Sequence, residues 1–374
     1  MAASGKVLIY AEDPGACNYL REIPDHLTEN EIESTLLCAG AAVNYLTQRG
    51  VDFTAIEPSD TPQDILDKHS PALMIVGTSE QRSSLAHELT DLCRDRSITT
   101  VGAVDMEANA DRRFRGITDS PLRHAPDWLL VPDRSCAEAF EKLSYRPERI
   151  VVAGHPHYDF VRRAAQSLNN RRELLRSDLI PGIRPQTRIV TFVCEGYDLL
   201  NRSASLRQND YSLYGRRKSD FRTAIVLEEL IDALETVRPK PFLIARLHPK
   251  MSGDELSAYF DEIDYLSSSE NPLEILAASD LIVGMSSILL QESVIMGRPT
   301  IAILPRKEEK QWLSVTAHDH IRTLFTRKQI RDFMTDLDSS IEAISGQAQH
   351  DFSQDSLTTI GSLIHKLIRE PSEP

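Results

Sequence analysis

One stretch of the sequence combines hydroxyl-bearing and acidic residues in a pattern that can bind an anion. Residues 281–283 form an apolar run typical of a buried strand, Gly284 permits a tight turn, and Ser286 or Ser287 can cap the helix that follows. Free N–H groups at a helix N-terminus carry about half a positive charge and attract anions. Glu292 lies near the same end of this helix. The stretch predicts a site for a phosphorylated, hydroxyl-rich ligand, and a capped helix of any α/β protein is the alternative.

A second phosphate-binding pattern follows an apolar run at 241–245. Arg246 and His248 are two residues apart in an extended segment, so their side chains point to the same side. A guanidinium and an imidazole placed in this way can bind a phosphate together. Polar residues on the protein surface are the alternative interpretation.

A basic and aromatic segment follows Glu195. It is long and polar, and in an acidic protein it can act as a lid over an anionic substrate. A solvated loop is an equally good interpretation. Its basic and tyrosine residues are Arg202, Arg207, Tyr211, Tyr214, Arg216, Arg217 and Lys218.

Small and polar residues follow two strand-like runs in the first third of the chain. Asp13, Gly15 and Asn18 come after the run at 6–10, and Thr78 and Ser79 come directly after the run at 72–76. Loops that follow strands in this way usually face the ligand in α/β proteins. The first of them lacks the Gly-x-Gly-x-x-Gly pattern of dinucleotide-binding proteins.

A third loop of this kind carries carboxylates. Asp105 and Glu107 follow the run at 99–104, and a carboxylate at a strand end can serve as a general base or accept a hydrogen bond from a sugar hydroxyl. In a doubly wound sheet all three loops open on one rim. We therefore expect Asp105 and Asp13 to face the same substrate.

The segment Gly154–Asp159 follows another strand-like run and contains His155 and His157. Two histidines separated by one residue in a turn interrupted by proline make a poor metal chelate without further ligands. A hinge turn with one histidine facing the ligand is the better interpretation, and we expect no metal site.

Alternating strands and helices must position these loops. Strand-like runs lie at 6–10, 34–38, 53–56, 72–76, 99–104, 128–131, 150–153, 188–193, 241–245, 281–283 and 300–304. Helix-like segments lie at 41–48, 83–95, 135–142, 223–237 and 356–369, and a loop followed by a helix at 15–27. This rhythm predicts an α/β protein with two doubly wound, Rossmann-like domains. We expect a first domain at 1–160, a polar, Arg-rich junction at 161–187, a second domain at 188–355 and a terminal helix at 356–369.

The composition narrows the class of protein. The formal net charge of −14 argues against a broad surface for nucleic acid. The five cysteines are scattered, which indicates reduced thiols. No apolar stretch approaches 18 residues and no secretory signal opens the chain, so we expect a cytoplasmic protein without an integral membrane segment.

Three segments resemble motifs of the GT-B superfamily. The closest similarity is to UDP-N-acetylglucosamine 2-epimerases, related sugar-nucleotide hydrolases, capsule-polysaccharide enzymes and CDP-glycerol glycerophosphotransferases. Gly154–Asp159 resembles their Gly-(Asn/His)-Pro-x-x-Asp turn between domains, 246–249 resembles Arg-x-His-Pro, and 279–299 resembles Ser-Asp…Ser-(Gly/Ser)…Glu…Gly-x-Pro. The layout matches over most of the chain, and the motifs match mainly between about 127 and 305.

The chain also departs from the epimerase pattern. Epimerases carry Ser-Gly-Gly where this chain has Ser286-Ser287-Ile288, and consecutive glutamates where it has Gln291-Glu292. These departures weaken the resemblance to epimerases in particular. The basic loop after residue 195 fits a transferase that binds an acceptor better.

The resemblance implies two Rossmann-like domains facing across a cleft, with the terminal helix packing back toward the first. It also implies that the second domain binds a nucleotide. Arg246 and His248 would approach the phosphates, Ser286 and Ser287 would donate to the diphosphate, and Glu292 would accept from the ribose hydroxyls. The first domain would bind the acceptor or the reacting sugar, and the expected substrate-loop residues are Gly15, Asn18, Thr78, Ser79 and, from the second domain, Glu195.

We therefore expect a transferase of glycan or glycoconjugate biosynthesis that moves a sugar or a polyol phosphate from a UDP- or CDP-linked donor. Asp105, Asp13 and His155 are the expected catalytic residues. No cofactor is expected beyond the donor; the partners are the donor and an unidentified acceptor, and the sequence leaves a homodimer open. A sugar-nucleotide epimerase or hydrolase and a non-catalytic nucleotide-sugar-binding scaffold are the alternatives.

Overall fold

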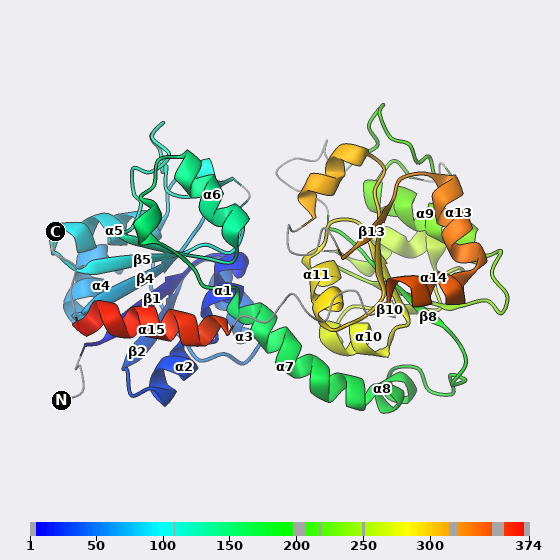
Figure 1. Cartoon of the computed structure of the whole chain (residues 1–374), viewed down its shortest axis with the longest axis horizontal. Helices are drawn as coiled ribbons and strands as arrows, with labels where there is room; N and C mark the ends of the chain where they lie inside the picture. Colours follow the sequence, from blue (N-terminus) through cyan, green and yellow to red (C-terminus); the bar gives the residue numbers. More distant parts are fainter. Residues whose placement is uncertain are drawn as a thin grey trace. The chain divides into compact units, whose positions relative to one another are not determined.

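The computed structural model divides the chain into two compact units. It describes residues 5–107, 109–196, 206–216, 219–248, 251–313, 320–345 and 355–369. Unit 1 comprises Met1–Asp159 and Gln354–Pro374, and unit 2 comprises Phe160–Ser353. Figure 1 shows that each unit is built around its own sheet with helices packed against it.

Unit 1 contains a seven-stranded sheet in the order β3-β2-β1-β4-β5-β6-β7, and all its strands are parallel. The neighbouring strands β1 and β4 consist of buried, mainly apolar residues, as expected for a parallel sheet with helices on both faces. The strands are β1 (Val7–Ala11), β2 (Ser34–Cys38), β3 (Thr54–Ala55), β4 (Leu73–Gly77), β5 (Thr99–Ala103), β6 (Trp128–Val131) and β7 (Ile150–Val152).

The helices of unit 1 cover its sheet on both sides. One face packs against α1 (Pro14–Leu20), α2 (Ile23–Glu29), α3 (Ala41–Thr47) and the terminal helix α15 (Ser356–Arg369). The other face packs against α4 (Pro62–His69) and α5 (Leu85–Asp95), with α6 (Arg134–Lys142) beside β6.

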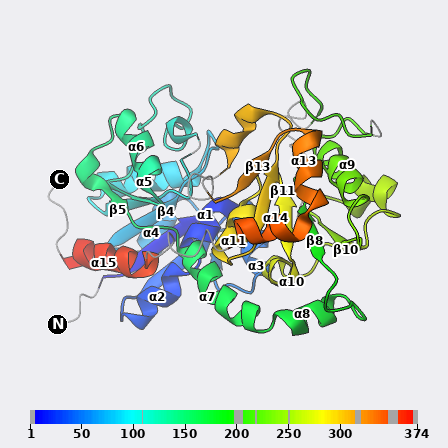
Figure 2. The same ribbon diagram turned by 45° about the vertical axis from the view of Figure 1, so that its right-hand side comes forward.

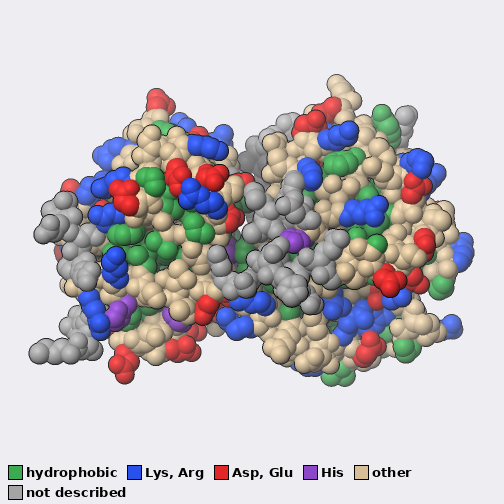
Figure 3. Space-filling view, viewed as in Figure 1, with side chains coloured by type: hydrophobic (Ala, Val, Ile, Leu, Met, Phe, Trp, Pro, Cys, Tyr) green, Lys and Arg blue, Asp and Glu red, His purple; other side chains and the backbone are tan. Residues whose placement is uncertain are grey.

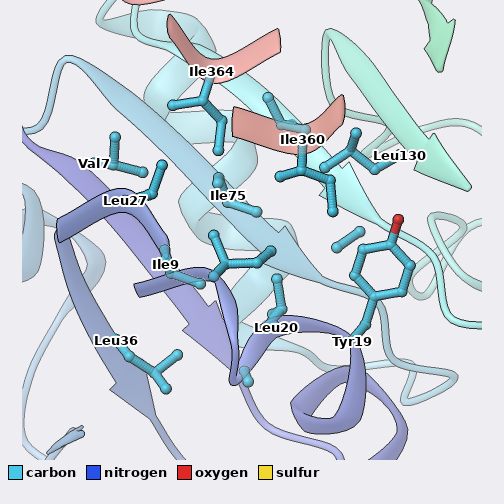
Figure 4. Close-up of a cluster of buried hydrophobic side chains, with 14 of the residues drawn as sticks. Val7, Ile9, Tyr19, Leu20, Leu27, Leu36, Ile75, Leu130, Ile360 and Ile364 are labelled. Carbon is cyan, nitrogen blue, oxygen red and sulfur yellow. The ribbon is translucent and has the colours of Figure 1, made fainter. Parts of the chain in front are cut away.

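The terminal helix α15 belongs to the core of unit 1. Ile360 and Ile364 are fully buried and point toward Ile9 and Ile75 of the sheet (Figure 4). Complete burial of such an aliphatic side chain contributes roughly 1.5–3 kcal/mol. The carboxylate of Asp159 accepts a hydrogen bond from the backbone N–H of Ser356 at 2.7 Å, which fixes the start of the helix.

Unit 2 contains a six-stranded parallel sheet in the order β10-β9-β8-β11-β12-β13. Its strands are β8 (Ile189–Val193), β9 (Phe242–Arg246), β10 (Tyr265–Ser267), β11 (Leu281–Gly284), β12 (Thr300–Ile303) and β13 (Arg322–Leu324). Its helices are α8 (Arg172–Leu179), α9 (Arg222–Leu234), α10 (Pro272–Ala278), α11 (Ile288–Ile295), α13 (Arg327–Thr335) and α14 (Leu337–Ile344), and α7 (Pro156–Asn170) runs into it from unit 1. Figure 2 shows α13 and α14 beside this sheet.

Both sheets reverse their strand order beside the strand that comes first in the unit. In unit 1 the reversal lies between β1 and β4, and in unit 2 between β8 and β11. Ligands of doubly wound proteins bind outside the carboxyl ends of the strands at such a point. The loops after these four strands are therefore the places to look for a site.

The predicted fold class is confirmed in its two parallel, doubly wound sheets and in the packing of the terminal helix on unit 1. The loop and helix expected at 15–27 are two helices, and Pro24 lies in the first turn of the second, because proline starts a helix better than it continues one. The residues 161–187, expected to contain a helix and a loop, form most of α7 and the whole of α8.

Candidate functional site

A carboxylate occupies the turn that the sequence predicts to bind an anion. Glu195 follows β8, and its Oε1 accepts hydrogen bonds from the backbone N–H of Ser286 and, at 3.0 Å, from its hydroxyl. Its Oε2 accepts a hydrogen bond from Arg222 at 2.5 Å. The residues after β8 and β11 are thus joined at the point where the strand order reverses.

Arg222 extends this arrangement toward a second carboxylate. Its side chain is 7% exposed and pairs with Glu309, whose other oxygen accepts from Arg306 at 2.8 Å. The guanidinium groups of Arg222 and Arg306 lie 5.5 and 5.4 Å from the ring of Trp312. Alternating charges of this kind hold the start of α9 against the segment after β12.

The other residues of the α11 turn have separate roles. Ser287 is the N-cap, and its hydroxyl accepts from the N–H of Leu289 at 3.3 Å. Ile288 is 44% exposed at the first helical position, whereas Glu292 is buried. The structure brings Ser286 to Glu195, and the role of Glu292 toward a ribose stays a prediction.

Arg246 and His248 follow β9 beside the same rim. Arg246 is buried, donates to the hydroxyl of Ser267 at 2.9 Å and lies 3.6 Å from Glu270. The hydrogen bonds to Glu270 lower the pKa of this carboxyl to about 2 despite the opposing effect of burial. His248 lies against the backbone of Gly196, where a Cβ atom would be only 2.6 Å from its Nδ1. His248 is therefore beside the Glu195 loop, while Arg246 is turned toward β10.

The corresponding site of unit 1 is built around Asp105. Arg113 donates to its carboxylate at 2.8 Å and to the hydroxyl of Thr78 at 2.7 Å. Arg113 is 4% exposed, and its carbonyl lies 3.0 Å from Nε2 of His87. The other oxygen of Asp105 lies against Gly15, where a Cβ would be 2.3 Å away. The structure thus brings Thr78, Asp105 and Gly15 together, as the sequence predicts.

Asp13 is in a different electrostatic environment from Asp105. It precedes α1 and is half-buried. Burial raises the pKa of its carboxyl and the negative charges of Glu12 and Asp105 raise it further, while a hydrogen bond with Ser79 works in the opposite direction. Asp105 is paired with a guanidinium, whereas Asp13 has only neutral or acidic partners among these groups. A carboxyl with a raised pKa can exchange a proton nearer to neutral pH.

His155 and Asn18 form contacts within unit 1. The ring of His155 stacks on Tyr158 at 4.4 Å and lies 4.8 Å from the ring of Tyr19. Its Nδ1 accepts from the N–H of His157 at 3.3 Å, and burial lowers its pKa well below the ordinary value. Asn18 accepts from the hydroxyl of Tyr45 at 2.6 Å. The buried, neutral ring holds the turn in place, and a catalytic role for His155 stays a prediction.

The basic loop after residue 195 lies partly outside the described residues, because 197–205, 217 and 218 are not described. The two arginines that are described are paired within unit 2. Arg207 contacts Asp220 at 2.8 Å, and Arg216 contacts Asp232 at 2.5 Å and Glu235 at 2.8 Å. These two side chains pair with the protein's own carboxylates.

Arg113 and Arg222 were not predicted as site residues from the sequence. Arg113 lies in an Arg-rich run, and nothing in the pattern separates the buried arginine from exposed Arg112 beside it. Arg222 follows a polar loop at the start of α9. In both cases the useful signal is the nearby strand-end carboxylate, which needs a counter-charge once it is partly buried.

Among the described residues, no cluster of three or more His, Cys, Asp or Glu side chains has the arrangement needed for a metal ion. No described helix is both long and apolar enough to cross a membrane.

Comparison with known proteins rests on structure. No protein-family model and no curated protein matches the sequence. The UDP-GlcNAc 2-epimerase of Neisseria meningitidis bound to UDP-GlcNAc matches with a TM-score of 0.63 at 12% identity, over 97% of this chain and 100% of that one. The UDP-GlcNAc 2-epimerase of Methanocaldococcus jannaschii matches with a TM-score of 0.65 at 11% identity, over 97% and 99%. The wall teichoic acid polymerase TagF matches with a TM-score of 0.58 at 14% identity, over 99% and 90%.

The chain has a GT-B fold. At these identities the similarity concerns the fold alone. In unit 2 of this GT-B chain, Glu195 and Arg222 form a polar cluster where the strand order reverses. In unit 1, Asp105 and Arg113 follow the neighbouring strand β5 and reach Gly15 and Thr78, which lie after β1 and β4.

Proposed function

We propose that this GT-B protein is an enzyme that transfers a sugar or a polyol phosphate from a UDP- or CDP-linked donor to an acceptor. The fold similarity supports this, because it spans nearly the whole chain and includes both an epimerase bound to UDP-GlcNAc and a wall teichoic acid polymerase. The setting would be glycan or glycoconjugate biosynthesis.

The arrangement around Ser286 carries the proposal. Its N–H and hydroxyl converge on one carboxylate, Glu195, and the buried guanidinium of Arg222 reaches the same group. Donors that bind a carboxylate also bind a phosphate oxygen. The diphosphate of the donor would compete with Glu195 for these groups, and His248 beside Gly196 would supply a further donor.

Unit 1 would supply the acid–base chemistry. Asp13, with its raised pKa, would accept the proton of the acceptor hydroxyl. Asp105, paired with Arg113, would position the substrate. The two carboxyls, proposed from sequence as alternatives, would thus have different tasks.

Thermal unfolding against UDP-, CDP-, GDP- and dTDP-linked compounds tests the proposal. A ligand at 100 times its dissociation constant adds roughly 2.7 kcal/mol to stability. We expect a shift with a UDP- or CDP-linked compound that His248→Ala abolishes and His365→Ala, an exposed position on α15, retains. The absence of a shift with every compound at millimolar concentration would contradict nucleotide binding.

Epimerisation or hydrolysis of a sugar nucleotide is the second candidate, favoured because two of the three structures described above are epimerases. Such a reaction needs no acceptor. Incubation with the donor alone separates the two, because an epimerase or hydrolase converts it and a transferase leaves it unchanged.

Asp13→Asn and Asp105→Asn distinguish an enzyme from a scaffold. In an enzyme that uses Asp13 as the base, Asp13→Asn lowers the rate by roughly 10²–10⁴-fold while nucleotide affinity holds. A scaffold would show no turnover in the unsubstituted protein and unchanged affinity in both variants.

A further inference from the structure

The Arg-rich segment of residues 160–188 has no part in the proposed function. It contains seven arginines and two acidic residues in a chain whose net charge is −14. It forms most of α7, all of α8 and the connection to β8. Figure 3 shows Lys and Arg side chains gathered near α8 and α10 on unit 2.

Three of these arginines converge on one carboxylate. Asp280 accepts from Arg172 at 2.7 Å and from Arg176 at 2.9 Å, and Arg188 lies 3.4 Å away. The carboxylate also accepts from the backbone N–H of Ile189, the first residue of β8, at 2.7 Å. This cluster is therefore at the amino edge of the sheet, the edge opposite Glu195 and Ser286.

A fourth arginine, Arg298, lies beside them and forms no ion pair within 4 Å with any described residue. It is in the Gly297-Arg298-Pro299 turn between α11 and β12. Among the described residues, no carboxylate or carbonyl pairs with its side chain, and its buried Nε has no hydrogen-bond partner. Burial and the positive charge of Arg172 lower its pKa, while the negative charge of Asp280 works in the opposite direction.

Two further buried atoms, which have no hydrogen-bond partner in the described part of the chain, lie on the elements that meet here. They are Nε of Arg176 and Oδ1 of Asn169, whose amide donates to the carbonyl of Met296 at 3.1 Å. Buried polar atoms nearly always have a partner, so a group of such atoms indicates a bound water or ion. A hydrogen phosphate can bond to both the guanidinium donors and the amide oxygen of Asn169, because its charged oxygens accept hydrogen bonds and its hydroxyl donates one.

The balance of charge favours an anion. Four guanidinium groups (172, 176, 188 and 298) are accompanied by three carboxylates, since Arg188 also pairs with Asp338 at 2.7 Å and Arg172 lies 3.8 Å from Glu173. The side chain of Arg172 is 24% exposed, so a ligand can reach it from solvent. Arginine is the residue best suited to bind phosphate through two parallel hydrogen bonds.

We propose that Arg298 and Arg172 form a second anion site, which binds a phosphate group at the amino edge of the unit 2 sheet. This site is separate from the proposed nucleotide site and does not depend on the proposed function. The phosphate can be that of a small soluble molecule or of a phospholipid headgroup, and the two sources share this chemistry.

Titration calorimetry and vesicle binding test the site. The first probe is inorganic phosphate at constant ionic strength, and the second is sedimentation with phosphatidic acid vesicles against phosphatidylcholine vesicles. The variants are Arg298→Gln and the conservative Arg298→Lys, with Arg331→Gln as a control that removes the same charge from an exposed position on α13. We expect Arg298→Gln to weaken binding of the effective probe at least tenfold and Arg331→Gln to change it less than twofold.

The outcomes separate this site from the nucleotide site. His248→Ala should lose the response to nucleotides and retain the phosphate binding that depends on Arg298. The proposal is supported if the unsubstituted protein binds either probe and Arg298→Gln does not. The Arg298→Gln variant must also unfold in chloride like the unsubstituted protein, which shows that its fold is intact. The probe that binds then identifies the source of the phosphate. Binding of neither probe, or equal binding by Arg298→Gln and Arg331→Gln, overturns it.

Discussion

Glu195 and Ser286 are joined across the point where the unit 2 sheet reverses its strand order. The Glu195 carboxylate accepts from the hydroxyl of Ser286 at 3.0 Å and from its backbone N–H, while Arg222 binds the other oxygen. Glu195→Ala should therefore lower the free energy of unfolding of unit 2 by about 1–3 kcal/mol, because partly buried donors lose their acceptor.

Urea unfolding of variants that also carry Trp128→Phe tests this prediction, because the fluorescence then comes from Trp312, which lies in unit 2. Glu308→Ala is the matched control, because Glu308 is exposed and forms no ion pair with a described residue. Equal stability of the two variants would contradict a structural role for the Glu195 contacts.

Arg113 should contribute strongly to the stability of unit 1. Arg113→Met leaves the Asp105 carboxylate without its guanidinium, and breaking a buried ion pair costs roughly 3–5 kcal/mol. Asp105 is 18% exposed, so we expect about 3 kcal/mol. Unfolding is followed through Trp128 in a Trp312→Phe background. The double variant Arg113→Met/Asp105→Asn should recover part of the loss, and strict additivity of the two substitutions would argue against a coupled pair.

Gly15→Ala should destabilise unit 1, although Gly15 is in a helix. Alanine normally stabilises a helix by up to about 1 kcal/mol relative to glycine. Here the new Cβ would lie 2.3 Å from an oxygen of Asp105. Thermal unfolding should therefore show a lower midpoint for Gly15→Ala than for the unsubstituted protein. In an Asp105→Ala background, where the clashing oxygen is absent, the same Gly15→Ala substitution should raise the midpoint. A raised midpoint in the single variant would show that Asp105 moves away without cost.

The sequence predicts the elements around the site well, because parallel strands buried on both faces appear as apolar runs. The runs at 34–38 and 128–131 coincide with β2 and β6. Short or polar elements were missed. The strands β10 and β13 have three residues each, and the polar sequence of α4 depends on a cap at Thr61 rather than on an apolar stripe.

The site was harder to predict than the fold because its contacts join residues far apart in the sequence. Residues just after a strand can be selected from the sequence, as Thr78, Asp105, Glu195 and Ser286 were, since each lies within two residues of a strand end. The sequence cannot show that Ser286 donates to Glu195 rather than to solvent, because this depends on two strands that are neighbours only in the folded sheet.

The buried ring of His155 predicts a loss of stability in mild acid. Burial holds its pKa well below the ordinary value of 6.5, so the unfolded chain binds a proton that the folded chain does not. The stabilising effect is complete above about pH 6.5 and is lost as the pH falls below that value. His155→Phe keeps an aromatic ring against Tyr158 and should reduce the slope of stability against pH by at most about 1.4 kcal/mol per pH unit. An unchanged slope between pH 5 and 6.5 would contradict a buried, neutral His155.

Asp13 predicts the opposite dependence on pH. Its raised pKa means that the folded protein retains the carboxyl proton at a pH where the unfolded chain has lost it. The stability that this proton provides is complete below the ordinary pKa of about 3.8 and is lost as the pH rises through the raised value. Asp13→Asn cannot ionise, so it should be more stable than the unsubstituted protein at pH 7, and the difference should shrink toward pH 4.

Urea unfolding of unit 1 through Trp128, repeated at several pH values, measures this difference. Asp52→Asn is the control, since Asp52 is exposed and has no described ion-pair partner, and its effect on stability should stay near zero throughout. If Asp13→Asn is instead less stable at pH 7, the carboxylate of Asp13 is stabilised in the fold. Asp13 would then be a poor candidate for the proton acceptor of the proposed transfer.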